Sequence, residues 1–316
     1  MRPNTTDNGV MSRFAWAALF VVYVVWGSTY LGIGIVIETI PPLLGGGMRF
    51  LAAAALLGVF LAWRKGPGVL RVPVPRLRSA VLVGILLLTG GNGMVAIAEQ
   101  HITTGLAALL VASVPLWLVV FRLGSGDRPS VATVVGVILG FSGVAMLSLL
   151  QDGGSGSGLG IAVILLAALA WSIGSFLSGR LPMPADSFVA SVYEMAAGGL
   201  LLVVLGFARG ERLDVAQISA RSWLALAYLV IFGSLLAFTS YVWLLGNAPI
   251  SLVGTYAYVN PTVAVLLGAL VLGEPVGPTT LAGGVVIILG VGLVVSTERR
   301  SRQPVPEPPA KVLDPQ

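Results

Sequence analysis

The chain has 316 residues, of which 56% are hydrophobic and only 10% are charged, and its mean hydropathy is +0.96. A soluble globular domain carries about 25% charged residues, so this composition excludes an ordinary soluble protein and indicates a chain that lies in lipid. The absence of cysteine excludes disulfides and thiolate metal sites, and the net charge of +5 does not indicate a nucleic-acid partner, because the basic residues lie between apolar segments.

Ten apolar runs are long enough to cross a bilayer as helices. In chain order they cover residues 14–36, 42–63, 79–98, 103–123, 130–150, 159–179, 186–208, 222–245, 250–272 and 278–296. Glycine and proline inside them do not argue against helix, because lipid forces the backbone to form its hydrogen bonds internally. The first run is too long for a signal peptide. We therefore predict an all-α integral membrane protein with ten transmembrane helices.

The distribution of Lys and Arg predicts the orientation. With the N-terminus inside, the basic residues on the cytoplasmic side are Arg2, Arg13, Arg64, Lys65, Arg71, Arg76, Arg78, Arg122, Arg128, Arg180, Arg299, Arg300, Arg302 and Lys311. The outer segments hold only Arg209, Arg212 and Arg221. Basic residues favour the cytoplasmic side of a membrane, so both termini are predicted to be cytoplasmic, in the plasma (inner) membrane.

The two halves of the chain resemble each other. An offset of 145 residues places Trp26 on Trp171 and Arg49 on Glu194, and an offset of 146 places Pro115 on Pro261. Since each half has five helices, the second half enters the membrane from the opposite side, as in an inverted repeat built for alternating access. The predicted organisation is a cytoplasmic segment (1–13), a first repeat (14–150), a Gly/Ser-rich external linker (151–158), a second repeat (159–296) and a Pro-rich disordered tail (297–316).

Five stretches carry a resemblance to a known family: WGSTYLGIG (26–34), MRFLAAAALL (48–57), GLAALLVASVPLW (105–117), GSLLAFTSYVWLL (233–245) and TYAYVNPTVAVLLGALVLGEP (255–275). Together they make the chain similar to the EamA family of the drug/metabolite transporter superfamily. The resemblance implies ten helices in two inverted halves, a central cavity and, usually, export of small metabolites or toxic compounds. The first helix lacks the glutamate of the related small multidrug resistance proteins, so their proton exchange does not carry over.

Two charged residues lie well inside the spans, Arg49 and Glu194. A charge in lipid is costly and normally faces the protein interior with a partner. Glu194 is read as a proton-exchanging or cation-binding group with Arg49 beside it, or the two form a permanent structural pair. Because Arg49 is the one basic residue deep in a span, a phosphorylated substrate is not expected.

Aromatic and amide side chains are further candidates for the substrate site. Trp26 and Tyr30 share one helix face, Trp171 is the repeat partner of Trp26, and helix 9 carries Tyr256 and Asn260 four residues apart. Ordinary helix packing is the alternative. The predicted substrate-binding residues are Trp26, Tyr30, Arg49, Asn92, Trp171, Glu194, Tyr256 and Asn260. Pro115 and Pro261 are predicted hinges or static kinks, because proline frees a carbonyl one turn back.

The predicted function is secondary export of small metabolites or drugs, neutral or cationic, including amino acids, by alternating access. The predicted partners are lipid, a small-molecule substrate and a proton or counter-substrate; a homodimer through the Gly136–Gly140 motif is left open. No enzyme, cofactor, metal or nucleic-acid motif is found. The alternatives are an importer or bidirectional facilitator and, outside transport, a membrane scaffold or receptor.

Overall fold

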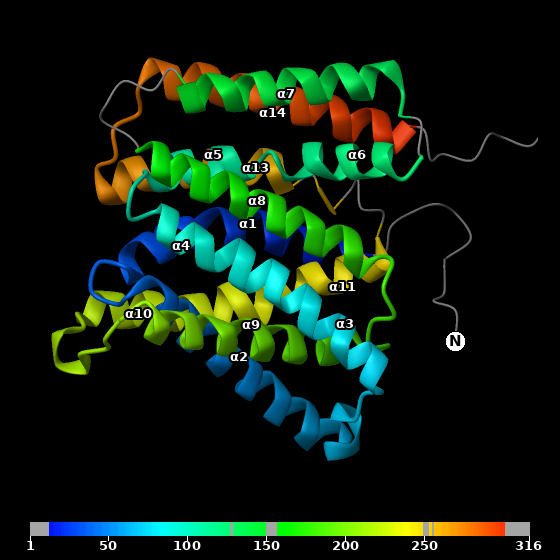
Figure 1. Cartoon of the computed structure of the whole chain (residues 1–316), viewed down its shortest axis with the longest axis vertical. Helices are drawn as coiled ribbons and strands as arrows, with labels where there is room; N and C mark the ends of the chain where they lie inside the picture. The colour runs from blue at the N-terminus through cyan, green and yellow to red at the C-terminus, as the bar shows by residue number, and fades with distance from the viewer. Residues whose placement is uncertain (1–12, 127–128, 150–156, 249–252, 255, 301–316) are drawn as a thin grey trace, which may run out of the picture.

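A computed structural model describes residues 13–126, 129–149, 157–248, 253–254 and 256–300, which form a bundle of roughly aligned helices (Figure 1). The predictions for the N-terminal segment, for the external linker and for the tail fall mainly on residues 1–12, 150–156 and 301–316. Those residues lie outside the described part of the chain.

The first half of the bundle contains α1 (Arg13–Val36), α2 (Pro42–Lys65), η1 (Pro67–Leu70), α3 (Val74–Gly84), η2 (Ile85–Gly93), α4 (Met94–Ala98), α5 (Thr104–Val111), α6 (Val114–Gly124) and α7 (Val131–Leu149). The second half contains α8 (Gly158–Ser178), α9 (Ser187–Ala208), η3 (Val215–Gln217), α10 (Ala220–Tyr228), η4 (Leu229–Phe238), α11 (Thr239–Asn247), α13 (Tyr256–Leu267), η5 (Gly268–Leu272) and α14 (Pro278–Arg300). Segments η1 and η3 are 3₁₀ turns, whereas η2, η4 and η5 are π-helical.

The helices have the length and the surface of membrane spans. In the described residues, eight helices are long and apolar enough to cross a bilayer, and two shorter apolar helices cover Val131–Leu147 and Val259–Leu272. Large apolar side chains such as Trp63, Leu224 and Leu270 are more than 70% exposed, as lipid-facing residues are. The all-helical membrane architecture is therefore confirmed, whereas the count of ten spans and the orientation stay predictions.

The two halves pack on each other through equivalent helices. Helix α2 lies against α9 at one edge of the bundle, and α7 lies against α14 at the other (Figure 1). At the second contact a Cβ on Gly290 would lie 2.3 Å from the backbone nitrogen of Gly140, and a Cβ on Gly136 would lie 2.9 Å from the carbonyl oxygen of Gly290. The Gly136–Gly140 motif thus serves helix packing within the chain, and a homodimer stays a prediction.

Several spans depart from regular α-helical geometry. The third and eighth predicted spans each contain a π-helical stretch, η2 and η4, and such stretches shift the direction of side chains and occur at functional sites. The fourth span breaks at Ala112–Ser113, and Pro115 lies in the first turn of α6. Pro261 lies inside α13. The two predicted hinge prolines therefore sit at a helix break and within a helix, respectively.

Candidate functional site

A cavity opens between the two halves near the centre of the bundle. Its empty space, mouth included, is about 600 Å³. It is lined by Trp26, Thr29, Tyr30, Ile33, Arg49, Phe50, Gly91, Asn92, Val95, Val111, Ala167, Trp171, Gly233, Phe238, Tyr256 and Asn260. The walls come from α1, α2, η2, α4, α5, α8, η4 and α13, and so from both repeats. A mostly apolar pocket with a few converging polar groups is typical of a small-molecule site.

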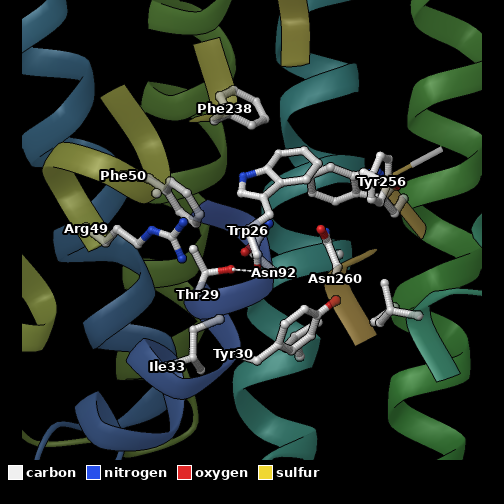
Figure 2. Close-up of a pocket in the computed structure, with 16 residues that line it drawn as sticks. Trp26, Thr29, Tyr30, Ile33, Arg49, Phe50, Asn92, Phe238, Tyr256 and Asn260 are labelled. Atoms are coloured by element: carbon white, nitrogen blue, oxygen red, sulfur yellow. Dashed lines mark hydrogen bonds between the residues drawn. The ribbon is translucent and has the colours of Figure 1, made fainter. Parts of the chain in front are cut away.

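Arg49 is the charged residue of this lining. It is 4% exposed, and its guanidinium reaches in from α2 next to Phe50 and Thr29 (Figure 2). Its Nε donates to the Oγ of Ser234 at 2.9 Å, and its Cζ lies 4.7 Å from the centroid of the Phe50 ring. Within the described residues the other guanidinium nitrogens donate to no protein acceptor. They are thus available to a ligand, and a guanidinium binds a carboxylate through two parallel hydrogen bonds.

Four aromatic side chains form a cluster beside the cavity, and three of them, Trp26, Trp171 and Tyr256, line it. The ring of Trp26 lies 5.3 Å from Trp171, 4.7 Å from Tyr241 and 5.3 Å from Tyr256, measured between centroids. The hydroxyl group of Tyr241 accepts a hydrogen bond from Nε1 of Trp171 at 3.2 Å and is 2.8 Å from Oγ of Ser175. Edge-to-face aromatic pairs stabilise a cluster beyond their buried area. We name these four residues, Trp26, Trp171, Tyr241 and Tyr256, the aromatic floor.

Two amides lie on the cavity wall. With its amide oriented to satisfy its neighbours, Asn260 donates to the carbonyl of Tyr23 at 3.0 Å and to that of Tyr256 at 3.2 Å. This leaves its oxygen as an acceptor on a side chain that lies across the cavity from Arg49 (Figure 2). Asn92 comes from the π-helical η2. Gly91 beside it gives room for Trp171, since a Cβ there would lie 2.7 Å from the indole ring.

The cavity continues toward the end of the bundle at which α1 ends and α2 begins. A smaller adjoining pocket shares Ile33, Arg49, Phe50 and Asn92 with the cavity and extends past residues 36–37 and Pro42. The aromatic floor lies on the other side. The cavity therefore extends toward this end of the bundle and is bounded by the aromatic floor on the other side.

The structure brings together seven of the eight predicted substrate-binding residues. These are Trp26, Tyr30, Arg49, Asn92, Trp171, Tyr256 and Asn260. Glu194 is 1% exposed and is not part of the lining. Gly84 of α3 crosses α9 so closely that a Cβ there would lie 2.4 Å from the carbonyl oxygen of Glu194. Arg49 and Glu194 do not form an ion pair, and their roles in a substrate site stay predictions.

Sequence reasoning missed several lining residues. Phe50, Gly91, Gly233 and Phe238 were not singled out, although they lie in the cavity wall. Phe50 directly follows Arg49, and the repeat offset of 146 carries Asn92 onto Phe238. The repeat was thus the signal that points to Phe238. A Cβ on Gly233 would lie 2.8 Å from Nη2 of Arg49. No sequence pattern predicts this close contact between the two residues.

Comparison with known proteins identifies the family to which the chain belongs. The model of the EamA-like transporter family matches residues 13–149 and again residues 158–296. The chain belongs to this family. The two matches cover both halves of the bundle, and they confirm the resemblance that the sequence motifs indicated.

Individual relatives agree with this assignment. The "Uncharacterized inner membrane transporter YedA" of Escherichia coli (strain K12) is 40% identical over 88% of this chain and 90% of its own. The "Probable terminal-alkyne amino-acid exporter" of Streptantibioticus cattleyicolor is 26% identical over 90% of this chain and 94% of its own. A solved crystal structure matches the fold with a TM-score of 0.66, at 22% identity over 92% of this chain and 99% of that one. The chain is thus a multi-pass transporter of the plasma (inner) membrane, and family and relatives indicate a transporter rather than an enzyme.

Proposed function

We propose that the protein is a secondary exporter of small carboxylate-bearing metabolites with an apolar body, such as amino acids, and that it works by alternating access. The observation that carries the proposal is Arg49, a buried cation in the wall of a cavity that is otherwise apolar, aromatic or neutral. A buried charge without a charged protein partner is costly. A substrate carboxylate supplies that partner.

The chemistry of the wall narrows the substrate class. The predicted class was neutral or cationic, with Glu194 as the candidate cation-binding group. Since Glu194 lies outside the lining while Arg49 lies in it, we favour zwitterions and carboxylates over cationic dyes and polyamines. The aromatic floor and Phe50 give an apolar side chain a surface to pack on. The printed name of the Streptantibioticus relative, an amino-acid exporter, supports this choice.

The internal repeat suggests how the site changes sides. Tyr30 and Arg49 line the cavity, whereas Ser175 and Glu194, their equivalents at the offset of 145, are buried in the closed half. In an inverted-repeat transporter the two halves exchange conformations. In the opposite state, therefore, Glu194 takes the position at the cavity that Arg49 has here. A zwitterion has a partner in each state, its carboxylate with Arg49 and its ammonium group with Glu194.

The direction of transport follows from the predicted orientation. With both termini in the cytoplasm, the end of the bundle past Val36 and Pro42 is external, so the cavity here opens outward. A cycle that loads the substrate in the inward state and releases it here is export, driven by a proton or a counter-substrate. An importer or facilitator with the same architecture is the alternative. A scaffold or receptor would not need two exchangeable halves around a charged cavity.

A thermal-shift screen tests the proposal. Purified wild-type protein and Glu194→Gln are melted with amino acids, purines, polyamines and cationic dyes. A ligand that binds the native state raises the melting temperature by mass action. We expect amino acids to stabilise both proteins alike, because Glu194 does not line the outward cavity. Stabilisation of wild type by cationic dyes or polyamines, but by no amino acid, would contradict the carboxylate assignment.

A further inference from the structure

Two acidic side chains from different halves approach each other beside the cavity, at the end toward which it opens. Glu99 follows α4 in the first half, and Glu274 follows η5 in the second half. Thr104 contacts Glu274, and the side chains of Thr104 and Glu99 both lie beside Gly34. Its Oγ1 donates to Oε2 of Glu274 at 3.0 Å, and a Cβ on Gly34 would meet both its Cγ2 at 3.0 Å and Oε2 of Glu99 at 3.8 Å. Neither acid lies within a candidate membrane span.

Glu274 has the surroundings of a carboxylate anion. Its Oε1 accepts a hydrogen bond from the backbone nitrogen of Thr104 at 2.8 Å, and its Oε2 accepts one from the backbone nitrogen of Gly105 at 3.2 Å in addition to the Thr104 hydroxyl. These donors form the first turn of α5. The amino end of a helix stabilises a negative charge, and three donors stabilise the ionised form of a carboxyl group.

Glu99 has the opposite surroundings. Both of its carboxyl oxygens are shielded from solvent, and among the residues that the structure describes they have no hydrogen-bond partner. An ionised carboxylate in such a place is strongly disfavoured unless it is paired. Burial, and then the negative charge of Glu274, hold the pKa of Glu99 well above its ordinary value. The carboxyl group of Glu274 is thus held by three hydrogen-bond donors, whereas that of Glu99 is built to carry a proton.

The other titratable groups around Glu99 offer it no positive charge. Tyr30 faces it from α1, and α8, α5 and η5 carry no titratable side chain. Arg49, the cation of α2 that lines the cavity, donates to Ser234. His101 is exposed in the loop that follows Glu99. Tyr30 also lines the cavity, so its side chain lies between Glu99 and the proposed substrate site.

We propose that Glu99 is the site at which this transporter binds and releases the proton that it exchanges for substrate. The proposal rests on the proposed function. Glu99 takes a proton from external water when the outer end is hydrated and holds it on its carboxyl group while the site is shielded. It releases that proton through the cavity once the cavity opens to the cytoplasm, so that the proton enters as the substrate leaves. Because Glu99 and Glu274 belong to different halves, a charge that appears on Glu99 repels Glu274 across their contact. The proton therefore affects how the outer ends of the two halves pack.

The first test needs no substrate. Melting temperatures of wild type and Glu99→Gln are measured from pH 5 to pH 9 in detergent. A raised pKa means that wild type has its full stability below the pKa of the unfolded chain, about 4.3, and loses stability as the pH rises toward the folded value. Glu99→Gln removes that loss. We therefore expect the melting temperature of Glu99→Gln to be higher than that of wild type at pH 8 and equal to it at pH 5. The infrared difference spectrum of wild type minus Glu99→Gln at pH 7 checks whether Glu99 contributes a protonated carboxyl band.

The second test measures coupling. Proteoliposomes are loaded with the amino acid that gives the largest thermal shift, and they are assayed both for exchange of labelled for unlabelled amino acid and for accumulation under a pH gradient. We expect Glu99→Gln to keep exchange and to lose the gradient-driven accumulation. Gln217→Ala, in an exposed loop, is the matched control and keeps both.

The outcomes separate the two proposals. A wild type that binds and exchanges no amino acid contradicts the proposed function, while the melting and infrared measurements still report the protonation of Glu99. A wild type that exchanges but responds to a sodium gradient instead of a pH gradient overturns the proton site. The proton site is also overturned if Glu99→Gln accumulates substrate as wild type does, or if the two proteins have the same melting temperature at every pH.

Discussion

Replacing Arg49 tests the substrate site most directly. Removing one partner of a buried, hydrogen-bonded charge pair costs about 2–5 kcal/mol, and each 1.4 kcal/mol is a factor of about ten in affinity. Because the cavity has an open mouth, we take the lower end of this range and expect Arg49→Gln to weaken amino-acid binding by roughly 30-fold. Arg49→Lys keeps the charge but not the paired donors, so its loss is smaller. Ser234→Ala removes only the hydrogen bond that orients the guanidinium.

Isothermal titration of purified protein gives these affinities, with the best amino acid of the thermal-shift screen and its amide as the pair of ligands. The amide lacks the carboxylate, so it binds wild type and Arg49→Gln equally weakly. Arg180→Gln is the matched control, because Arg180 is an exposed arginine outside the cavity lining. The reasoning is refuted if Arg49→Gln binds the amino acid as tightly as wild type, or if wild type does not distinguish the acid from its amide.

Three further predictions concern the floor, the packing and the orientation. Tyr241→Phe leaves the indole N–H of the floor without its acceptor, so we expect a loss of about 1–3 kcal/mol of unfolding free energy in denaturant titrations; an unchanged midpoint would argue against this bond. Gly290→Ala places a methyl group 2.3 Å from a backbone nitrogen and lowers the melting temperature, whereas Gly277→Ala, with nothing within 4 Å, leaves it unchanged. Because the chain has no cysteine, single-cysteine labelling reports topology: in intact cells an impermeant maleimide reaches Ala216→Cys but not Ser125→Cys, and the reverse pattern would invert the assigned orientation.

Much of the cavity wall could be predicted from the sequence, because a helix fixes which residues share a face. Trp26 and Tyr30 lie one turn apart on α1, Tyr256 and Asn260 one turn apart on α13, and all four line the cavity. The repeat added Trp171 from the second half. Periodicity thus identifies a face, and the match between halves indicates that the face belongs to the shared interior.

The position of Glu194 could not be predicted in the same way. Counting residues from the helix ends gives its depth in the membrane but not the direction in which it points around the bundle. That direction depends on the close crossing of α3 over α9, which Gly84 permits. The buried state of Glu99 was also outside the reach of the sequence, since the residue follows the end of a span. Its carboxyl group lies beside Gly34 of α1, near the point where Thr104 of α5 bonds to Glu274, a contact between residues about 170 positions apart.

The repeat places two residues of opposite charge, Arg49 and Glu194, at equivalent positions of the two halves. If the equivalent positions held the same residue, the outward and inward cavities would offer a substrate the same partner. In the proposed cycle one state presents Arg49, which lines the cavity here, and the other, by exchange of the halves, presents its repeat equivalent Glu194. A ligand shifts a conformational equilibrium only by its difference in affinity for the two states. A carboxylate without an amine therefore favours the outward state and an amine without a carboxylate the inward state, whereas a zwitterion binds both. Only the zwitterion can then pass through the full cycle without holding the protein in one state. We therefore expect amino acids to be transported, and simple carboxylates or simple amines not to be.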